Sequence, residues 1–286
     1  MIAITGATGH LGRATLTTLL DKVPANQLIA LVRDTQKAAD LSAQGVQVRV
    51  GDYNDPATLQ AAFQGAEKVL LISGDDLENR LQQHKNVIDA AKAAGVRHVL
   101  YTSVTNPSAD SHFGASPSHV ATEAYLKESG LTYTLLRNTL YLDILPMMIG
   151  ENALPSGQLY AAAGEGKVSY ALRQDLAEAT ATILSTSGHD NQTYDLAPAP
   201  AYSFQDIAAT LSEVAGQPVQ YVAITPEALA GGMREHHVPE PVVTMMVGLS
   251  KAMAADEFNL SSPTLEKLLG RQPTDLKTFL AGVYGK

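Results

Sequence analysis

The chain has 286 residues, of which 45% are hydrophobic and 17% are charged, and its formal net charge at pH 7 is −9. This composition is ordinary for a globular protein with a substantial core, and an acidic charge without any lysine- or arginine-rich run argues against a nucleic-acid surface. The chain has no cysteine, which excludes disulfides, thiol catalysis and cysteine-ligated metals. It also has no apolar run long enough to span a membrane, so we expect a cytoplasmic protein with no membrane contact.

The first twelve residues combine a short apolar run with closely spaced glycines. Residues 2–5 form the run, Gly6, Gly9 and Gly12 follow it, and a helical pattern of leucines comes next. A strand, a tight turn and a helix in this order present backbone N–H groups and the positive end of a helix dipole to an anion, and glycine lets a pyrophosphate approach closely. The spacing is G-x-x-G-x-x-G rather than the common G-x-G-x-x-G. With a second apolar strand at 28–33, it predicts a nucleotide-binding turn.

Strand and helix patterns alternate as far as about residue 136. Strands that are apolar throughout, such as 69–72, suit a parallel sheet that is covered on both faces. Right-handed crossovers then give a doubly wound α/β sheet, in which ligands bind beyond the carboxyl ends of the strands. The predicted strands are 2–5, 28–33, 46–50, 68–73, 97–102 and 132–136, and the predicted helices are 10–20, 35–43, 56–63, 79–94 and 117–129.

The end of the second strand bears on the choice of nucleotide. Arg33 follows this strand, and Asp34 comes next. An acidic side chain here takes the ribose 2′-hydroxyl of NAD, whereas an arginine pairs with the 2′-phosphate of NADP. A charge-assisted hydrogen bond contributes about 1.5–3 kcal/mol, enough for a preference of tenfold or more. We therefore expect Arg33 to select NADP, and the alternative is that Asp34 faces the ribose while Arg33 lies on the surface.

The next strand ends offer further cofactor contacts. Asp52 can accept a hydrogen bond from the adenine amino group and Tyr53 can cover the base, although both also fit an ordinary turn before a helix that Asp55 caps. Ser73 is small where the chain must pass close to the ribose and diphosphate. The predicted contacts at the ends of the fourth and fifth strands are Ser73, Thr102 and Ser103.

Histidines on two predicted helices are candidates for proton transfer. His119 and Glu123 are four residues apart on the helix 117–129, so they share a face and Glu123 can orient His119. A histidine there can donate a proton at neutral pH, or it can be an exposed residue of the first turn. We expect His84 on the surface of its helix or behind the site. The polar segment 106–117 is long enough to border a substrate site.

The sixth strand ends on a polar cluster. Asn138 is placed to hydrogen-bond the nicotinamide or a substrate oxygen, and Tyr141 to line the pocket. Arg137 can be the buried partner of a structural ion pair. We therefore count Asn138 and Tyr141, together with His119, as the candidate catalytic residues.

The regular alternation weakens after the sixth strand. We expect a short strand after the glycine-rich residues 163–167, a helix from Arg173, a strand at 193–196 and another near 218–222. His236 and His237 lack further ligands at suitable spacing, so no metal site is predicted. The apolar residues 242–247 fit either the core or an interface, which leaves a homodimer open. The predicted domains are 1–150 with 170–198 returning to it, and a smaller, mostly helical lobe of 151–169 and 199–286.

As an ensemble, these motifs resemble the atypical short-chain dehydrogenase/reductases of the NmrA-like group, and most of all its bacterial NADPH-dependent quinone oxidoreductases and triphenylmethane-dye reductases. The likeness extends over nearly the whole chain and implies a Rossmann domain, a smaller C-terminal lobe and a substrate cleft between them. It is carried by residues 6–12, 32–33, 51–53, 72–73, 93–96, 101–103, 119–123 and 136–141. It assigns phosphate binding to Gly6, Thr8, Gly9, His10, Leu11 and Gly12, and the 2′-phosphate to Arg33.

One departure from typical dehydrogenases narrows the expected chemistry. Their Tyr-x-x-x-Lys pair is missing, and His119 and Glu123 stand at the corresponding helix positions. Without such a pair, alcohol dehydrogenation is disfavoured, whereas hydride transfer to a strongly electrophilic acceptor asks less of the protein. The resemblance therefore implies an NADPH-dependent oxidoreductase acting on a small quinone-like or dye-like conjugated acceptor. The alternative is a non-catalytic protein that senses NADP(H) and docks a regulator.

Overall fold

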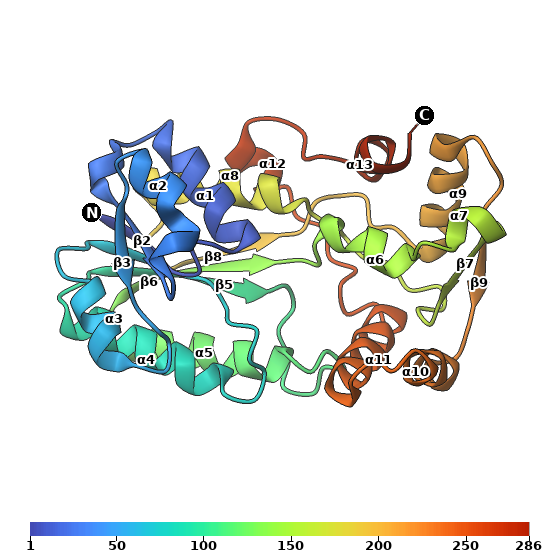
Figure 1. Cartoon of the computed structure of the whole chain (residues 1–286), viewed down its shortest axis with the longest axis horizontal. Coiled ribbons are helices and arrows are strands. Elements are labelled where there is room, and N and C mark those ends of the chain that lie inside the picture. Colours follow the sequence, from blue (N-terminus) through green and yellow to red (C-terminus); the bar gives the residue numbers. More distant parts are fainter. Residues whose placement is uncertain (286) are drawn as a thin grey trace.

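A seven-stranded parallel sheet forms the centre of the molecule, in the order β3-β2-β1-β4-β5-β6-β8 (Figure 1). The computed structural model describes residues 1–285. The strand order reverses between β1 and β4, and ligands of doubly wound sheets bind at this switch point. The strands are β1 (Ile2–Ile4), β2 (Leu28–Val32), β3 (Gln47–Val50), β4 (Lys68–Leu71), β5 (His98–Val104), β6 (Thr132–Asn138) and β8 (Gln192–Leu196).

Helices cover both faces of this sheet, as expected for strands that are buried throughout. Because side chains alternate along a strand, Leu70 and Leu100 pack toward α1 (His10–Leu20) and α8 (Arg173–Ser185). Leu71 and Tyr101 belong to the core cluster on the other face. That face is covered by α3 (Pro56–Ala62), α4 (Arg80–Ala93) and α5 (Ser116–Glu128). The predicted doubly wound Rossmann-type fold is thus confirmed.

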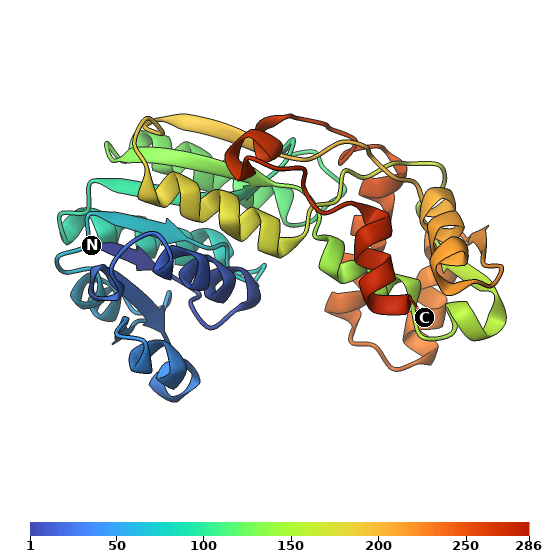
Figure 2. The same ribbon diagram turned by 90° about the horizontal axis from the view of Figure 1, so that it is seen from above.

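A smaller, mostly helical lobe lies beyond the carboxyl ends of the strands, and Figure 2 shows it beside the sheet. It has its own hydrophobic core, to which Phe204, Leu211 and Met253 contribute. A two-stranded parallel sheet of β7 (Gln158–Ala161) and β9 (Gln220–Ala223) belongs to this lobe. Its helices are α6 (Leu145–Ile149), α7 (Ala153–Ser156), α9 (Phe204–Ala215), α10 (Pro226–Glu235), α11 (Glu240–Ala254) and α13 (Leu276–Tyr284), while α12 (Thr264–Leu269) packs on α8.

The sequence-based boundaries differ from the structure mainly after the sixth strand. The short strand expected after 163–167 is wrong, since β7 precedes this segment and Val168 forms only an isolated bridge with Tyr202. The helix expected at 35–43 is a 3-10 turn (Thr35–Ala38) followed by α2 (Ala39–Ala43), and a further 3-10 turn spans Ala25–Gln27 and another Leu142–Ile144. Within residues 1–285, no helix is long and apolar enough to cross a membrane.

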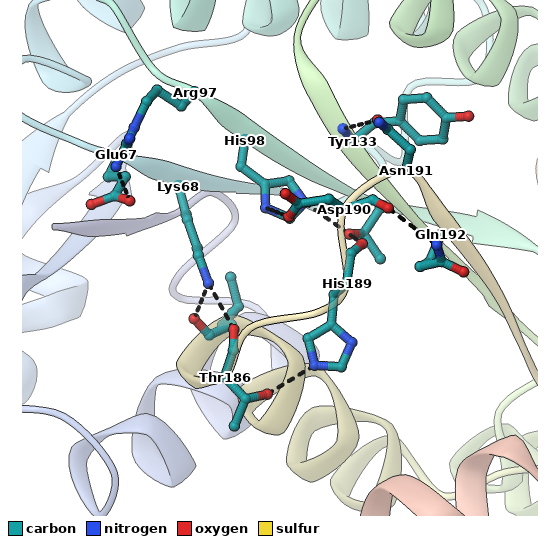
Figure 3. A network of polar contacts seen from close by, with 12 residues as sticks. Glu67, Lys68, Arg97, His98, Tyr133, Thr186, His189, Asp190, Asn191 and Gln192 are labelled. Atoms are coloured by element: carbon teal, nitrogen blue, oxygen red, sulfur yellow. Dashed lines mark hydrogen bonds and ion pairs between the residues drawn. The ribbon is translucent and has the colours of Figure 1, made fainter.

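A polar network at the amino ends of the strands ties α8 and β8 to the rest of the sheet (Figure 3). Lys68, the first residue of β4, donates from Nζ to the carbonyls of Leu184 (2.8 Å) and Thr186 (3.2 Å) at the end of α8. Thr134 donates to the His189 carbonyl at 2.6 Å, so its hydroxyl oxygen accepts from Nε2 of the buried His98 at 2.8 Å. The network therefore holds the last strand of the sheet in register.

Candidate cofactor and acceptor site

A cavity of about 880 Å³ runs along the carboxyl ends of the strands at the switch point. This volume is within the usual range for small-molecule and cofactor sites. Its wall is made by the glycine turn, by the ends of β2, β3 and β4, and by Tyr141 and Arg173 from the other half of the sheet. The predicted site residues on this wall are Gly6, Thr8, Gly9, His10, Leu11, Gly12, Arg33, Asp52, Tyr53, Ser73 and Tyr141.

The glycine turn leaves the amino end of α1 free for an anion. Gly6 has a φ of +56°, which favours glycine, and its carbonyl accepts from the Gly9 N–H at 2.9 Å. A Cβ at Gly12 would lie 2.3 Å from the Gly6 carbonyl oxygen, so only glycine lets α1 pack this closely on the turn. No side chain caps α1, and its first turn holds no acidic residue. The first backbone N–H groups of α1 can therefore bind a diphosphate.

Cations gather where the second strand ends. Arg33 is exposed on the cavity wall and has no ion-pair partner in residues 1–285. Asp34 instead accepts from the Gln36 N–H at 2.9 Å and caps the following turn. Arg13 also lines the cavity, where it pairs with Asp40 and donates to the Lys37 carbonyl at 2.7 Å. This arrangement suits a phosphate near Arg33.

The far end of the glycine turn is covered by a cation that sequence reasoning missed. Arg173 begins α8, and its Nη1 lies 3.1 Å from Nδ1 of His10. Asp143 fixes it by accepting from its backbone N–H at 2.9 Å, and the guanidinium carbon lies 5.4 Å from the centre of the Tyr141 ring. The sequence does not reveal this position, because α8 lies beside the glycine turn only once the sheet has formed. Arg173 thus adds positive charge beside the predicted diphosphate.

The part of the cavity wall that is predicted to face the adenine is held by hydrogen bonds. Tyr53 donates from its hydroxyl to the Ile72 carbonyl at 2.8 Å and also contacts the Thr5 hydroxyl. Burial raises the pKa of Tyr53, so the hydroxyl stays protonated and donating. Asp52 accepts from the Asn54 N–H at 2.8 Å, and Asp55 caps α3 as predicted. Tyr53 therefore presents a fixed ring to the cavity.

Polar groups without a well-formed hydrogen bond lie on the cavity wall and behind it. The Ser73 N–H donates to Oγ1 of Thr102 at 2.9 Å, but the Ser73 hydroxyl and both amide atoms of Asn138 form no hydrogen bond of good geometry among the residues described. The hydroxyls of Tyr101 and Tyr141 lie near Ser73 and Asn138, respectively. Thr102, Ser103 and Asn138 are at most 4% exposed and are not on the cavity wall. Buried polar groups are nearly always paired. An unpaired amide at the end of β6 therefore suits a ligand that carries an amide of its own.

The structure separates His119 from Glu123, and the expected contact between them is wrong. Glu123 accepts from Arg137 at 2.9 and 2.8 Å and from the Ser103 hydroxyl at 2.7 Å, which confirms the predicted ion pair of Arg137. His119 is instead 2.7 Å from the Tyr101 hydroxyl. Burial, aided by the charge of Arg80, lowers the pKa of His119 to about 3. His119 is therefore neutral at pH 7, which disfavours it as a proton donor.

His84 is fully buried rather than on the helix surface. Thr122 donates to the Ser118 carbonyl at 2.8 Å, so its hydroxyl accepts from Nδ1 of His84 at 2.9 Å. Nε2 of His84 then accepts from the Gly74 N–H at 3.1 Å. Burial is the main reason why the pKa of His84 falls to about 3. The neutral ring thus fixes the segment that carries Ser73 and Gly74.

The polar segment 106–117 is fastened to the smaller lobe. Glu257, just after α11, accepts from the His112 N–H at 3.1 Å and lies 2.6 Å from Nδ1 of the same residue. It also accepts from the Ser111 hydroxyl.

Among residues 1–285 no group of three or more potential metal ligands is found.

Comparisons with known proteins agree with this geometry. A model of the NmrA-like family matches residues 1–280. The chain is 41% identical over 288 residues to quinone oxidoreductase 2 of Escherichia coli, covering 99% of each chain. The structure of the NADPH-dependent quinone oxidoreductase of Escherichia coli with NADPH is similar, with a TM-score of 0.95 over all of both chains and 38% identity. The Citrobacter triphenylmethane reductase with NADP(H) has a TM-score of 0.93 and 39% identity, over 99% of this chain and all of the other.

Proposed function

The chain belongs to the NmrA-like family, and on this basis we propose that it is an NADPH-dependent oxidoreductase that transfers hydride to a quinone-like or conjugated dye-like acceptor. The proposal is supported by two features that lie at the same edge of the sheet. A cavity with a free helix end and an exposed Arg33 has Ser73 on its wall, and Asn138 is buried behind that wall without a well-formed hydrogen bond. Phosphates fit the first feature and a carboxamide fits the second.

NADPH fits the residues that are present. The N–H groups of the glycine turn and Arg173 would hold the diphosphate, Arg33 would hold the 2′-phosphate, and Tyr53 would cover the adenine. The Asn138 amide would pair with the carboxamide of the nicotinamide, satisfying atoms that otherwise stay unpaired. When bound, this cofactor supplies a hydride, which carries the hard chemistry. The remaining task of the protein is to position the acceptor.

Neither of the two helix residues considered for proton transfer is arranged as a strong acid. The helix positions that hold tyrosine and lysine in typical dehydrogenases carry His119, which is neutral at pH 7, and Glu123, which is committed to Arg137. We propose that solvent supplies the proton that a reduced quinone takes up. His119→Ala is then expected to lower turnover only modestly. Complete loss of turnover in a folded variant that still binds NADPH would show that His119 is required.

We propose that the acceptor binds between the sheet edge and the smaller lobe. Residues 1–150 and 170–198 would then form the cofactor domain, and residues 151–169 and 199–286 would form the acceptor side. Tyr141 lines the cavity, and Glu257 fastens the loop 106–117 to the smaller lobe.

The direct test follows NADPH oxidation by absorbance with menadione and with crystal violet, together with NADPH binding in the absence of an acceptor. We expect NADPH-dependent turnover with at least one acceptor. Tight NADPH binding without turnover on either would favour the sensor over the enzyme. Absence of NADPH binding would contradict the assignment of the cavity.

A further inference from the structure

A buried arginine next to the site has two unused nitrogen atoms. Arg80 is the first residue of α4, and only 7% of it is exposed. Its Nε and Nη1 atoms are buried and lack a hydrogen-bond partner in residues 1–285. A guanidinium stays charged at any ordinary pH, and burying a charge without a partner is costly. Such a group points to a ligand that completes it.

The carboxylates nearest in sequence do not complete Arg80. Asp76 accepts from the Asn79 N–H at 3.1 Å, from the Asn79 amide at 3.0 Å and from Gln83 at 3.2 Å. Asp75 lines the cavity, and neither aspartate forms an ion pair with Arg80 within the described chain. Burial lowers the pKa of Arg80, and the charges of Asp75 and Asp76 partly offset this effect. The two aspartates are therefore close enough to stabilise the charge of Arg80, but they do not accept its hydrogen bonds.

Arg80 lies behind the cavity wall rather than on it, because Asp75, Asp76 and Gln83, which flank it in the chain, line the cavity. It shares the α4 and α5 face with Tyr101, His84 and His119. Burial and then the charge of Arg80 lower the pKa of His119, and the same charge acts on Tyr141 at the cavity. The phosphate end of the cavity already has its own cations in Arg13, Arg33 and Arg173. With these cations serving the phosphates, the acceptor is the group left to complete Arg80.

We propose that Arg80 contacts the acceptor and selects neutral quinones, whose oxygen becomes negative on reduction, over cationic dyes. This inference rests on the proposed function and names its substrate class. A neutral quinone that takes up a hydride gains one proton and two electrons and becomes the hydroquinone monoanion, to which solvent adds a second proton. A cationic triphenylmethane dye becomes neutral in the same step. A fixed cation stabilises the first product and opposes binding of the second substrate.

The test measures binding, so that it does not depend on turnover. NADP⁺-loaded protein is titrated with picrate, an anionic aromatic phenolate, and with crystal violet, a cationic dye. The proteins are the wild type, R80M, R80K and the control R97M, because Arg97 is an exposed arginine paired with Glu67 at the opposite edge of the sheet. NADPH affinity is measured for all four.

We expect R80M to weaken picrate binding about tenfold, the loss of one charge-assisted hydrogen bond, and to leave crystal violet binding equal or stronger. R80K should stay within about threefold of the wild type, and R97M should not differ from it. NADPH affinity should stay within about twofold in every variant. If R80M does not fold, R80Q takes its place with the same expectation.

Two results would overturn the inference. Equal picrate affinity in the wild type and R80M would show that Arg80 does not meet the acceptor. A parallel loss of picrate and NADPH affinity would make Arg80 a cofactor contact instead. Turnover of the wild type with menadione tests the proposed function separately. Its absence, with picrate discrimination retained, would contradict the reductase activity but not the anion preference of Arg80.

Discussion

The amino and carboxyl edges of the same sheet differ in how completely their polar groups are paired. At the amino edge, Lys68, His98 and Thr134 all have hydrogen-bond partners that tie β8 and α8 to the sheet (Figure 3). The buried side chains that hold an atom without a well-formed hydrogen bond lie near or after the carboxyl ends of strands. Asn138 is the last residue of β6, and Asp195 is the last but one of β8. In the part of the chain that the structure describes, the others are Ser73, Arg80, Thr105, Thr139, Ser169 and Arg173.

This difference separates stability from function within one fold. A paired buried network stabilises the native state, whereas an unpaired buried group destabilises it and persists where it serves a ligand. Arg173 is an intermediate case, because its Nε lies 3.3 Å from Asp143 in an ion pair. We therefore expect changes at the amino edge to alter stability alone, and changes at the carboxyl edge to alter ligand binding.

The largest expected effect comes from pH and involves the carboxyl edge. The pKa values of His84 and His119 are about 3 in the folded protein, mainly because of burial, against about 6.5 in the unfolded chain. Between these values the unfolded state binds protons that the folded state does not, so stability falls as the pH falls. At pH 5 each histidine should cost roughly 2 kcal/mol relative to pH 7.

Urea unfolding at pH 7 and pH 5 measures this loss. The variant H119Q removes one of the two titrating groups, so its stability should fall by roughly 2 kcal/mol less than that of the wild type between these pH values. The same pH dependence in H119Q and in the wild type would mean that His119 is not held neutral by burial.

A change at the amino edge should reduce stability and leave binding intact. Thr134→Val keeps the shape of the side chain but removes the hydroxyl between His98 and the His189 carbonyl. The buried Nε2–H of His98 then lacks a partner, which should lower the free energy of unfolding by about 2 kcal/mol. Urea unfolding measures this loss, and the NADPH dissociation constant should stay within about twofold. A large change in NADPH affinity would contradict the view that the amino edge of the sheet affects stability alone.

The smallest effect concerns the choice between cofactors. Arg33→Ala should weaken NADPH binding by about tenfold, or about 1.4 kcal/mol, and leave NADH binding nearly unchanged, because only NADPH carries the 2′-phosphate. Arg97→Ala, at the exposed amino edge, is the matched control and should change neither affinity. Equal losses for both cofactors in Arg33→Ala would instead mean that Arg33 has a structural role.

The fold was predictable because its signals are local. The glycine turn, the apolar strands and the alternation with helices up to β6 each depend on neighbouring residues in the chain, and all are confirmed. After β6 the prediction weakened, and β7 was missed, because its partner is β9 and the two strands are far apart in the sequence. Alternate residues of β7 are exposed, so this strand has no continuous apolar run in the sequence.

Where a motif fixes a strand end, the sequence predicted residues that line the cavity, as for Gly6, Gly12 and Arg33. Sequence reasoning missed Arg80 and Arg173, which are ordinary arginines at helix starts. Their significance depends on burial and on which partners are absent, and neither property can be read from spacing. His119 shows the converse case, because the helix register that placed Glu123 beside it did not reveal the stronger pairing of Glu123 with Arg137.

The central claim is that NADPH completes unpaired groups at the carboxyl edge, and Asn138→Leu tests it most directly by urea unfolding with and without NADPH. This change removes a buried amide that forms no hydrogen bond of good geometry, although the Tyr141 hydroxyl lies near it. The free variant should therefore be as stable as the wild type or about 1 kcal/mol more stable. At a NADPH concentration about 100 times the wild-type dissociation constant, the wild type should gain about 2.7 kcal/mol and the variant at least about 1 kcal/mol less. A destabilised free variant, or an undiminished gain with NADPH, would contradict the account.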